Sequence, residues 1–112
     1  MMKLETLKEL SKNGFNLEPR EMIRIDGEMV VVDWFQPDFD WFIAKLPKAC
    51  RKDNIMYSLE ITPAMSVNGG FYVGYVNMLD TNKAMFKLIY APALSDALGN
   101  TWIKLKKDGY IK

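Results

Sequence analysis

The segment Glu21-Met22-Ile23-Arg24-Ile25-Asp26-Gly27-Glu28-Met29-Val30-Val31-Val32-Asp33-Trp34-Phe35 contains the strongest local folding signal of the chain. Two apolar runs flank the dipeptide Asp26-Gly27. This dipeptide suits a two-residue type I′ turn, because both central residues of that turn need a positive φ. The pattern therefore predicts a β-hairpin with strands at residues 21–25 and 28–35.

The hairpin leads into a segment rich in aromatic side chains. Five rings lie within residues 34–42, and three carboxylates lie among or beside them: Trp34, Phe35, Phe39, Trp41 and Phe42, with Asp33, Asp38 and Asp40. So much ring area on an acidic segment indicates either the centre of a small core or a surface that binds a partner. The sequence leaves these two interpretations open.

A short helix is predicted at residues 38–46. Apolar side chains recur there at a helical spacing, at Phe39, Phe42, Ile43 and Leu46. Asp38 can cap the first turn of this helix, and Pro47 ends it. An extended segment is the alternative, because Trp, Phe and Ile also favour strands.

Three more strands are predicted in the second half of the chain, at residues 55–62, 71–79 and 84–91. The first alternates apolar with polar side chains, which indicates a half-buried strand. The second is apolar on both faces and fits the centre of a sheet. Asn68-Gly69-Gly70 is predicted to be a hairpin loop, since its residues admit unusual backbone angles.

Amphipathic helices are predicted at both ends of the chain. Lys3–Lys12 carries a leucine at every third position from Leu4 to Leu10 on one face, and Asn13-Gly14 is the expected end of this helix. Pro92 opens the last helix. Gly99 lies within it and costs about 1 kcal/mol of helix propensity relative to Ala, so it indicates a close approach to the sheet.

The element order α-ββ-α-βββ-α predicts an α+β fold, because strands follow one another instead of alternating with long helices. The 112 residues are predicted to form a single domain, residues 1–112, which is large enough for a core without metals or disulfides. The simplest arrangement is a single antiparallel sheet of about five strands, packed against the N- and C-terminal helices.

The residue types exclude several kinds of chemistry. The chain has no histidine and one cysteine, Cys50, which rules out Ser-His and Cys-His nucleophiles, thiolate zinc sites and an internal disulfide. We therefore predict a protein that is not an enzyme, with no catalytic residues, no cofactor and no metal. The single cysteine and a start unlike a signal peptide favour a cytoplasmic protein. No apolar run approaches the ~20 residues of a membrane span, so we expect no membrane association.

Charge is balanced over the whole chain but unevenly distributed along it. Fifteen basic and fourteen acidic residues give a net charge of +1. Residues 18–40 contain seven acids and two arginines, a net charge of −5, whereas residues 45–52 contain four basic residues and no acid. The favoured interpretation is that these charged residues lie on ordinary solvent-exposed faces. The second interpretation is that they form a charged binding surface.

At the C-terminal end, Tyr90-Ala91-Pro92 precedes Ala93-Leu94-Ser95-Asp96-Ala97-Leu98-Gly99-Asn100-Thr101-Trp102-Ile103-Lys104-Leu105. At the other end, a short leucine-bearing helix and Asn13-Gly14 precede a strand with Ile25-Asp26-Gly27. These two ends resemble small phage and prophage proteins, in which a proline opens an "ALxxAL…W" helix that closes a small α+β domain. The resemblance implies an origin in a mobile element, and it carries over no activity or catalytic residue.

The favoured function is a small non-catalytic module that binds a protein, either a second copy of itself as a homodimer or a host factor. Large aromatic side chains dominate interface energetics when they meet a pocket, and carboxylates around them can steer a basic partner. The predicted partner-binding residues are Trp34, Trp41, Phe42, Asp38 and Asp40, with Asp33 in the same polar rim.

The alternative function is a single-stranded nucleic-acid-binding protein. Aromatic rings stack on bases when they lie on a sheet inside a basic groove. The residues predicted for this role are Lys45, Lys48, Arg51, Lys52, Tyr72 and Tyr75. The acidity of residues 18–40 argues against it, because carboxylates repel phosphate.

Overall fold

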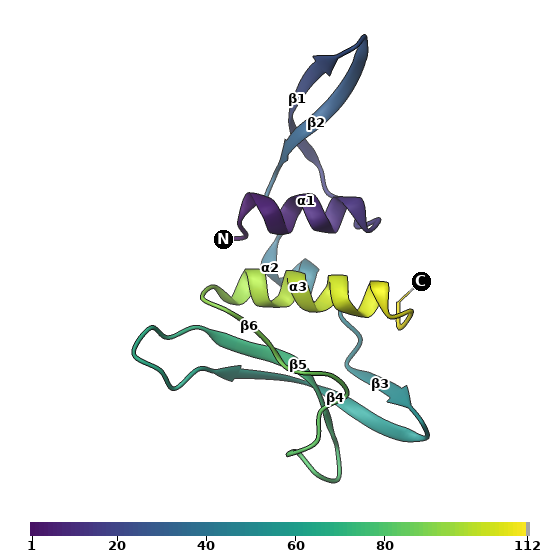
Figure 1. The fold of residues 1–112 in the computed structure, drawn as a ribbon, viewed down its shortest axis with the longest axis vertical. Helices are drawn as coiled ribbons and strands as arrows, with labels where there is room; N and C mark the ends of the chain where they lie inside the picture. Colours follow the sequence, from purple (N-terminus) through teal and green to yellow (C-terminus); the bar gives the residue numbers. More distant parts are fainter. Residues whose placement is uncertain (112) are drawn as a thin grey trace.

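The computed structural model describes residues 1–111. Their helices and strands form an α+β fold with two separate sheets (Figure 1). The elements are α1 (Leu4–Lys12), β1 (Pro19–Ile25), β2 (Glu28–Trp34), α2 (Phe39–Ile43), β3 (Ala49–Lys52), β4 (Ile55–Pro63), β5 (Phe71–Asn77), β6 (Ile89–Ala91) and α3 (Leu94–Lys107). The strands β1 and β2 form a two-stranded sheet. The other four form an antiparallel main sheet in the order β3-β4-β5-β6.

The prediction of a single five-stranded sheet is therefore wrong, although the α+β class is confirmed. Figure 1 shows α1 lying between the hairpin and α3, and α3 lying across the main sheet. The helices thus form a layer that keeps the hairpin away from the main sheet. Local turn chemistry determines that β1 pairs with β2, but it does not determine which side of the helices the hairpin occupies.

The predicted hairpin turn is confirmed. Asp26 and Gly27 have φ values of 49° and 80°, as a type I′ turn requires. Ile25 pairs with Glu28 next to the turn, and the antiparallel register continues to Met22 opposite Val31. The hairpin is therefore determined by its own sequence.

The core lies between the helices and one face of the main sheet. Leu98 and Leu105 of α3 are fully buried, as are Leu10 of α1 and Tyr75 of β5. Leu4 is half exposed, which differs from the predicted leucine face of α1, and Thr6 takes a buried position instead. The reason is that the side of α1 nearest α3 contains Thr6 and Leu10.

Asp96 of α3 joins the two long helices. Its Oδ1 accepts hydrogen bonds from the Lys3 backbone N–H and from Thr6 Oγ1, both at 2.7 Å. The carboxylate therefore satisfies a free amide at the start of α1 that no side chain of α1 itself caps.

Gly99 marks a close approach to α1 and not to the sheet, so that part of the prediction is wrong. A Cβ at Gly99 would lie 2.7 Å from Thr6 Cγ2 and 3.4 Å from Met2 Cε. The missing side chain therefore lets α3 pack closely against α1.

The edges of the main sheet also differ from prediction. The strand β3 was not predicted, because its four residues are too short and too basic to give a strand pattern. The strand predicted at 84–91 is reduced to an isolated bridge between Ala84 and Val76 and to the three residues of β6. Leu88 packs directly against Gly74 of β5 at this place, so a face of the sheet is covered here where a strand was predicted.

Candidate functional site

The β1–β2 hairpin projects from one end of the molecule, and we call it the hairpin arm (residues 19–34; Figure 1). The radius of gyration is 15.7 Å, against about 13 Å for a compact chain of this length. The accessible surface is 7575 Å², whereas area scaling gives about 6,300 Å² for this mass. The arm therefore exposes area that a domain of this size normally hides.

Apolar side chains are exposed on both faces of the hairpin arm. Every residue from 18 to 30 is exposed, and the large apolar ones are Met22, Ile23, Ile25, Met29 and Val30. Neighbouring residues of a strand point to opposite faces, so Met22 and Ile23 lie on different sides of the ribbon. An isolated two-stranded hairpin is at best marginally stable in water, so this ribbon is suited to being covered by another molecule.

The base of the arm is held by specific contacts. The Phe35 backbone N–H donates to the Glu18 carbonyl at 2.9 Å, and Arg20 Nη1 lies 3.0 Å from Asp33 Oδ2. The register shifts on either side of Glu21, which marks an irregularity of the β-bulge type. Bulges bend a strand, so this position sets the direction in which the arm leaves the body.

Trp41 lies at the base of the arm, and this residue is 44% exposed. Its backbone N–H donates to Asp38 Oδ2 at 3.0 Å, which confirms Asp38 as the cap of α2. Its ring packs edge-on against Phe15 at a centroid distance of 5.6 Å, and Lys45 Nζ lies 5.0 Å from the ring centroid. These contacts hold the indole in one orientation while leaving much of its surface accessible.

Two shallow hollows flank the Trp41 ring. One, of about 220 Å³, lies between the chain that enters β1 at Leu17 and Glu18 and the chain that leaves β2 at Gln36 and Pro37. The other, of about 330 Å³, is lined by Phe15, Asn16 and Trp102 among others. The exposed indole thus lines both hollows, and each hollow can accept a side chain of a partner.

The structure places the other predicted anchor rings in the core. Trp34 is 8% exposed and Phe42 is 2% exposed, and Phe42 packs on Phe15 at 4.9 Å. Neither ring is accessible enough to contact a partner in this structure. Of the predicted acids, Asp38 caps α2, Asp33 bonds Arg20 and the Trp34 amide, and Asp40 is exposed in the first turn of α2.

Sequence reasoning missed Phe35 and Phe39, which are exposed rings of the same segment. The helical spacing of this segment predicts some of these exposures. Phe42 belongs to the predicted apolar stripe of residues 39, 42, 43 and 46, whereas Trp41 lies outside it. Burial of Phe42 and exposure of Trp41 follow from that spacing, but the exposure of Phe39 does not.

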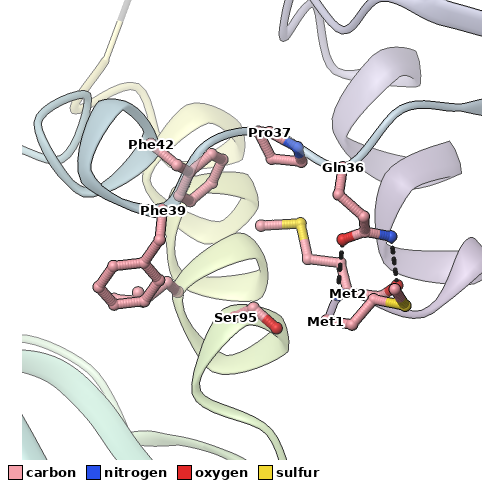
Figure 2. A pocket seen from close by; sticks show the side chains of 8 residues that line it. Met1, Met2, Gln36, Pro37, Phe39, Phe42 and Ser95 are labelled. Carbon is pink, nitrogen blue, oxygen red and sulfur yellow. Dashed lines mark hydrogen bonds between the residues drawn. The ribbon is translucent and has the colours of Figure 1, made fainter.

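Phe39 borders a small apolar pocket of about 240 Å³ between α2 and the start of the chain (Figure 2). Figure 2 shows Phe39 and Phe42 across this pocket from Gln36 and Met2. The side chain of Gln36 binds the Met2 backbone twice, accepting from its N–H at 2.8 Å and donating to its carbonyl at 2.9 Å. These two bonds fix the first residues of the chain against the base of the arm.

The residues of the nucleic-acid alternative do not form one groove. Tyr75 is fully buried, its hydroxyl donates to the Pro47 carbonyl at 2.7 Å, and burial raises its pKa. Tyr72 is exposed beside Tyr90, with ring centroids 5.2 Å apart.

The exposed rings and the predicted basic residues are far apart on the sheet. All four predicted basic residues are exposed, but only Arg51 and Lys52 lie toward the other end of the main sheet, because Lys45 lies beside Trp41 and Lys48 precedes β3. Tyr72 pairs with Thr62 of β4, whereas Arg51 pairs with Met56, and six residues of strand span about 20 Å.

The cysteine and the carboxylates do not come together into a reactive centre in residues 1–111. Cys50 is buried on the inner face of β3, and this burial raises the pKa of its thiol, which disfavours the reactive thiolate. No group of three or more Cys, Asp or Glu side chains within residues 1–111 is placed to hold a metal ion. Among the same residues, no helix has the length and apolar character needed to cross a membrane.

Comparisons with family models, curated proteins and solved structures give no match to this chain.

Proposed function

We propose that this chain is a small non-catalytic protein-interaction module that binds its partner through the hairpin arm and Trp41. The observation that carries the proposal is the exposure of five large apolar side chains on both faces of a projecting two-stranded ribbon. Scattered exposed apolar residues are normal, but a contiguous set on a projecting element is typical of a binding surface.

Trp41 is the proposed anchor at the base of the arm, since a rigidly held and half-exposed indole loses little conformational freedom on binding. Asp40 and the acids of the arm, Glu21 and Glu28, form the proposed polar rim, which favours a basic partner surface. The resemblance of the chain ends to phage proteins supports a mobile-element origin, and we propose that the module acts in the cytoplasm.

The proposal predicts that capture of a partner depends on the arm and on Trp41. The tagged chain, used as bait in host-cell lysate, is compared with an Ile23→Ser/Ile25→Ser variant and with Trp41→Ala. We expect both variants to lose the captured protein, since each removes apolar contact area at the interface. Met65→Ala is the matched control, because Met65 is 99% exposed on the β4–β5 loop, outside the arm.

The proposal is wrong if all of these variants retain the same captured proteins. Circular dichroism of each variant separates loss of binding from loss of folding, which is a small risk at these exposed positions.

The nucleic-acid alternative has one favourable observation, the exposed pair Tyr72 and Tyr90 on the outer face of the main sheet. The distance between this pair and the basic residues 45–52 argues against a single groove. We expect no increase in fluorescence anisotropy of a labelled single-stranded oligonucleotide at low salt. Binding that weakens steeply as salt is added would instead support this alternative.

A further inference from the structure

A second exposed apolar surface lies at the far end of the molecule from the hairpin arm. It is a hollow of about 410 Å³ where the β3–β4 turn meets the end of β5, and we call it the sheet-end hollow. Its lining residues are Asn54, Ile55, Met56, Asn77, Met78 and Leu79. The four apolar ones are exposed, and Leu79 is 98% exposed.

The arm and the sheet-end hollow have opposite charge. The arm carries Glu21, Asp26, Glu28 and Asp33 against two arginines, and one of these arginines is already paired with Asp33. At the hollow, Arg51 and Lys52 lie on the edge strand β3 and are both exposed, and Lys83 lies next to the lining residue Asn77. The nearby acids are Asp53 in the β3–β4 turn and Asp80 after Leu79, so the surroundings of the hollow carry a net charge of +1. Arg51 pairs with Met56 and Lys52 with Ile55, so these two cations stand directly beside the lining of the hollow.

We propose that the hairpin arm of one copy docks in the sheet-end hollow of a second copy of this chain. This inference rests on the proposed function and names the partner. Apolar side chains on one face of the arm, such as Ile23 and Ile25, fill the hollow. Glu28 pairs with Ile25 and shares that face, and Glu21 and Glu28 meet Arg51 and Lys52. The exposed edge of β3 also offers unpaired backbone groups to a strand of the arm.

Stability argues for a second copy as the partner, and the exposed area is large enough for such an interface. The ribbon is marginally stable when isolated, so it needs a partner that is present whenever the chain is made. The surface in excess of area scaling, about 1,300 Å², exceeds the about 800 Å² that each partner buries in a standard interface.

Symmetry favours a closed dimer. The arm and the main sheet lie at opposite ends of the longest axis, which spans 54 Å (Figure 1). Two copies placed side by side in opposite directions bring each arm to the hollow of the other. The contact then occurs twice around one two-fold axis, and no surface is left over to propagate a filament. Pairing arm with arm would instead bring two net acidic surfaces together.

The test is the oligomeric state of the purified full chain and of charge-reversed variants, by sedimentation equilibrium over a wide concentration range. We expect a dimer for the wild type. Glu21→Lys/Glu28→Lys and Arg51→Glu/Lys52→Glu should each weaken the dimer by about tenfold or more. The chain that carries all four reversals should regain much of the lost affinity, because opposite charges then face each other again.

A pair of apolar variants tests the hollow itself. Leu79→Ser removes an apolar contact in the hollow and should weaken the dimer, whereas Met65→Ser, on an equally exposed loop outside the hollow, should leave it unchanged. A monomer at every concentration overturns the inference, and so does a dimer that weakens with the arm variants but not with the hollow variants, which would indicate arm-to-arm pairing. A monomer whose arm and Trp41 variants still lose a captured host protein would leave the proposed function standing.

Discussion

Replacing Trp34 and Trp41 by alanine should give opposite results. We expect Trp34→Ala to lower the free energy of unfolding by about 3–5 kcal/mol, because it leaves a cavity in the core where an 8%-exposed indole now packs. A small domain has only about 5–15 kcal/mol of stability, so this variant should have a strongly reduced denaturation midpoint. Chemical denaturation followed by circular dichroism measures the loss.

Trp41→Ala should instead leave the domain folded. The residue is 44% exposed, and the variant loses the edge-on packing with Phe15, the cation–π contact with Lys45 and the burial of the covered part of the indole. The free energy of unfolding should therefore fall by about 2–3 kcal/mol, less than for Trp34→Ala. Partner binding should weaken by roughly 30-fold, the size of effect expected when a hot-spot ring of about 2 kcal/mol is lost.

Either half of this comparison can fail on its own. If Trp41→Ala unfolds the domain, the indole is structural and the anchor role is lost. If Trp34→Ala stays as stable as the wild type, the placement of that ring in the core is wrong. Trp41→Phe is a useful third variant, because it keeps an aromatic ring against Phe15 but reduces the exposed ring area.

The local elements could be predicted from the sequence because each has a short-range cause. Asp26-Gly27 determines its turn through backbone angles, and Asp38 caps α2 through one hydrogen bond to the Trp41 amide. Pro92 and the stripe that follows it predicted α3, which begins two residues later. None of these signals depends on where the element lies in the fold.

The position of the hairpin could not be predicted in the same way. The simplest arrangement of the predicted strands was a single sheet, which would include the hairpin. In the structure α1 occupies the space between the hairpin and α3, held there by Asp96. A bond that joins Lys3 to a residue more than ninety positions away has no signature in one sequence, so the exposed arm, which dominates the candidate site, was missed.

A larger side chain at Gly99 should cause the second large loss of stability. Gly99→Val should lower the free energy of unfolding by about 3 kcal/mol, because its Cβ would lie 2.7 Å from Thr6 Cγ2 and its γ-methyl groups would reach toward Met2 and Leu10. Gly99→Ala should lose less, since the overpacking by one methyl group is partly offset by about 1 kcal/mol of gained helix propensity.

The cause of the loss can be tested with Thr6→Ser. Serine keeps the hydroxyl that donates to Asp96 Oδ1 but removes the Cγ2 methyl group that meets residue 99. We therefore expect Thr6→Ser/Gly99→Ala to be more stable than Gly99→Ala alone, although Thr6→Ser on its own removes a buried methyl group and destabilises the wild type. Thr6→Ser thus destabilises the wild type but stabilises Gly99→Ala, and such a change of sign is expected for two residues in direct contact. Thermal denaturation of the wild type, the two single variants and the double variant measures it. Additive effects would mean that α1 and α3 do not meet at these residues.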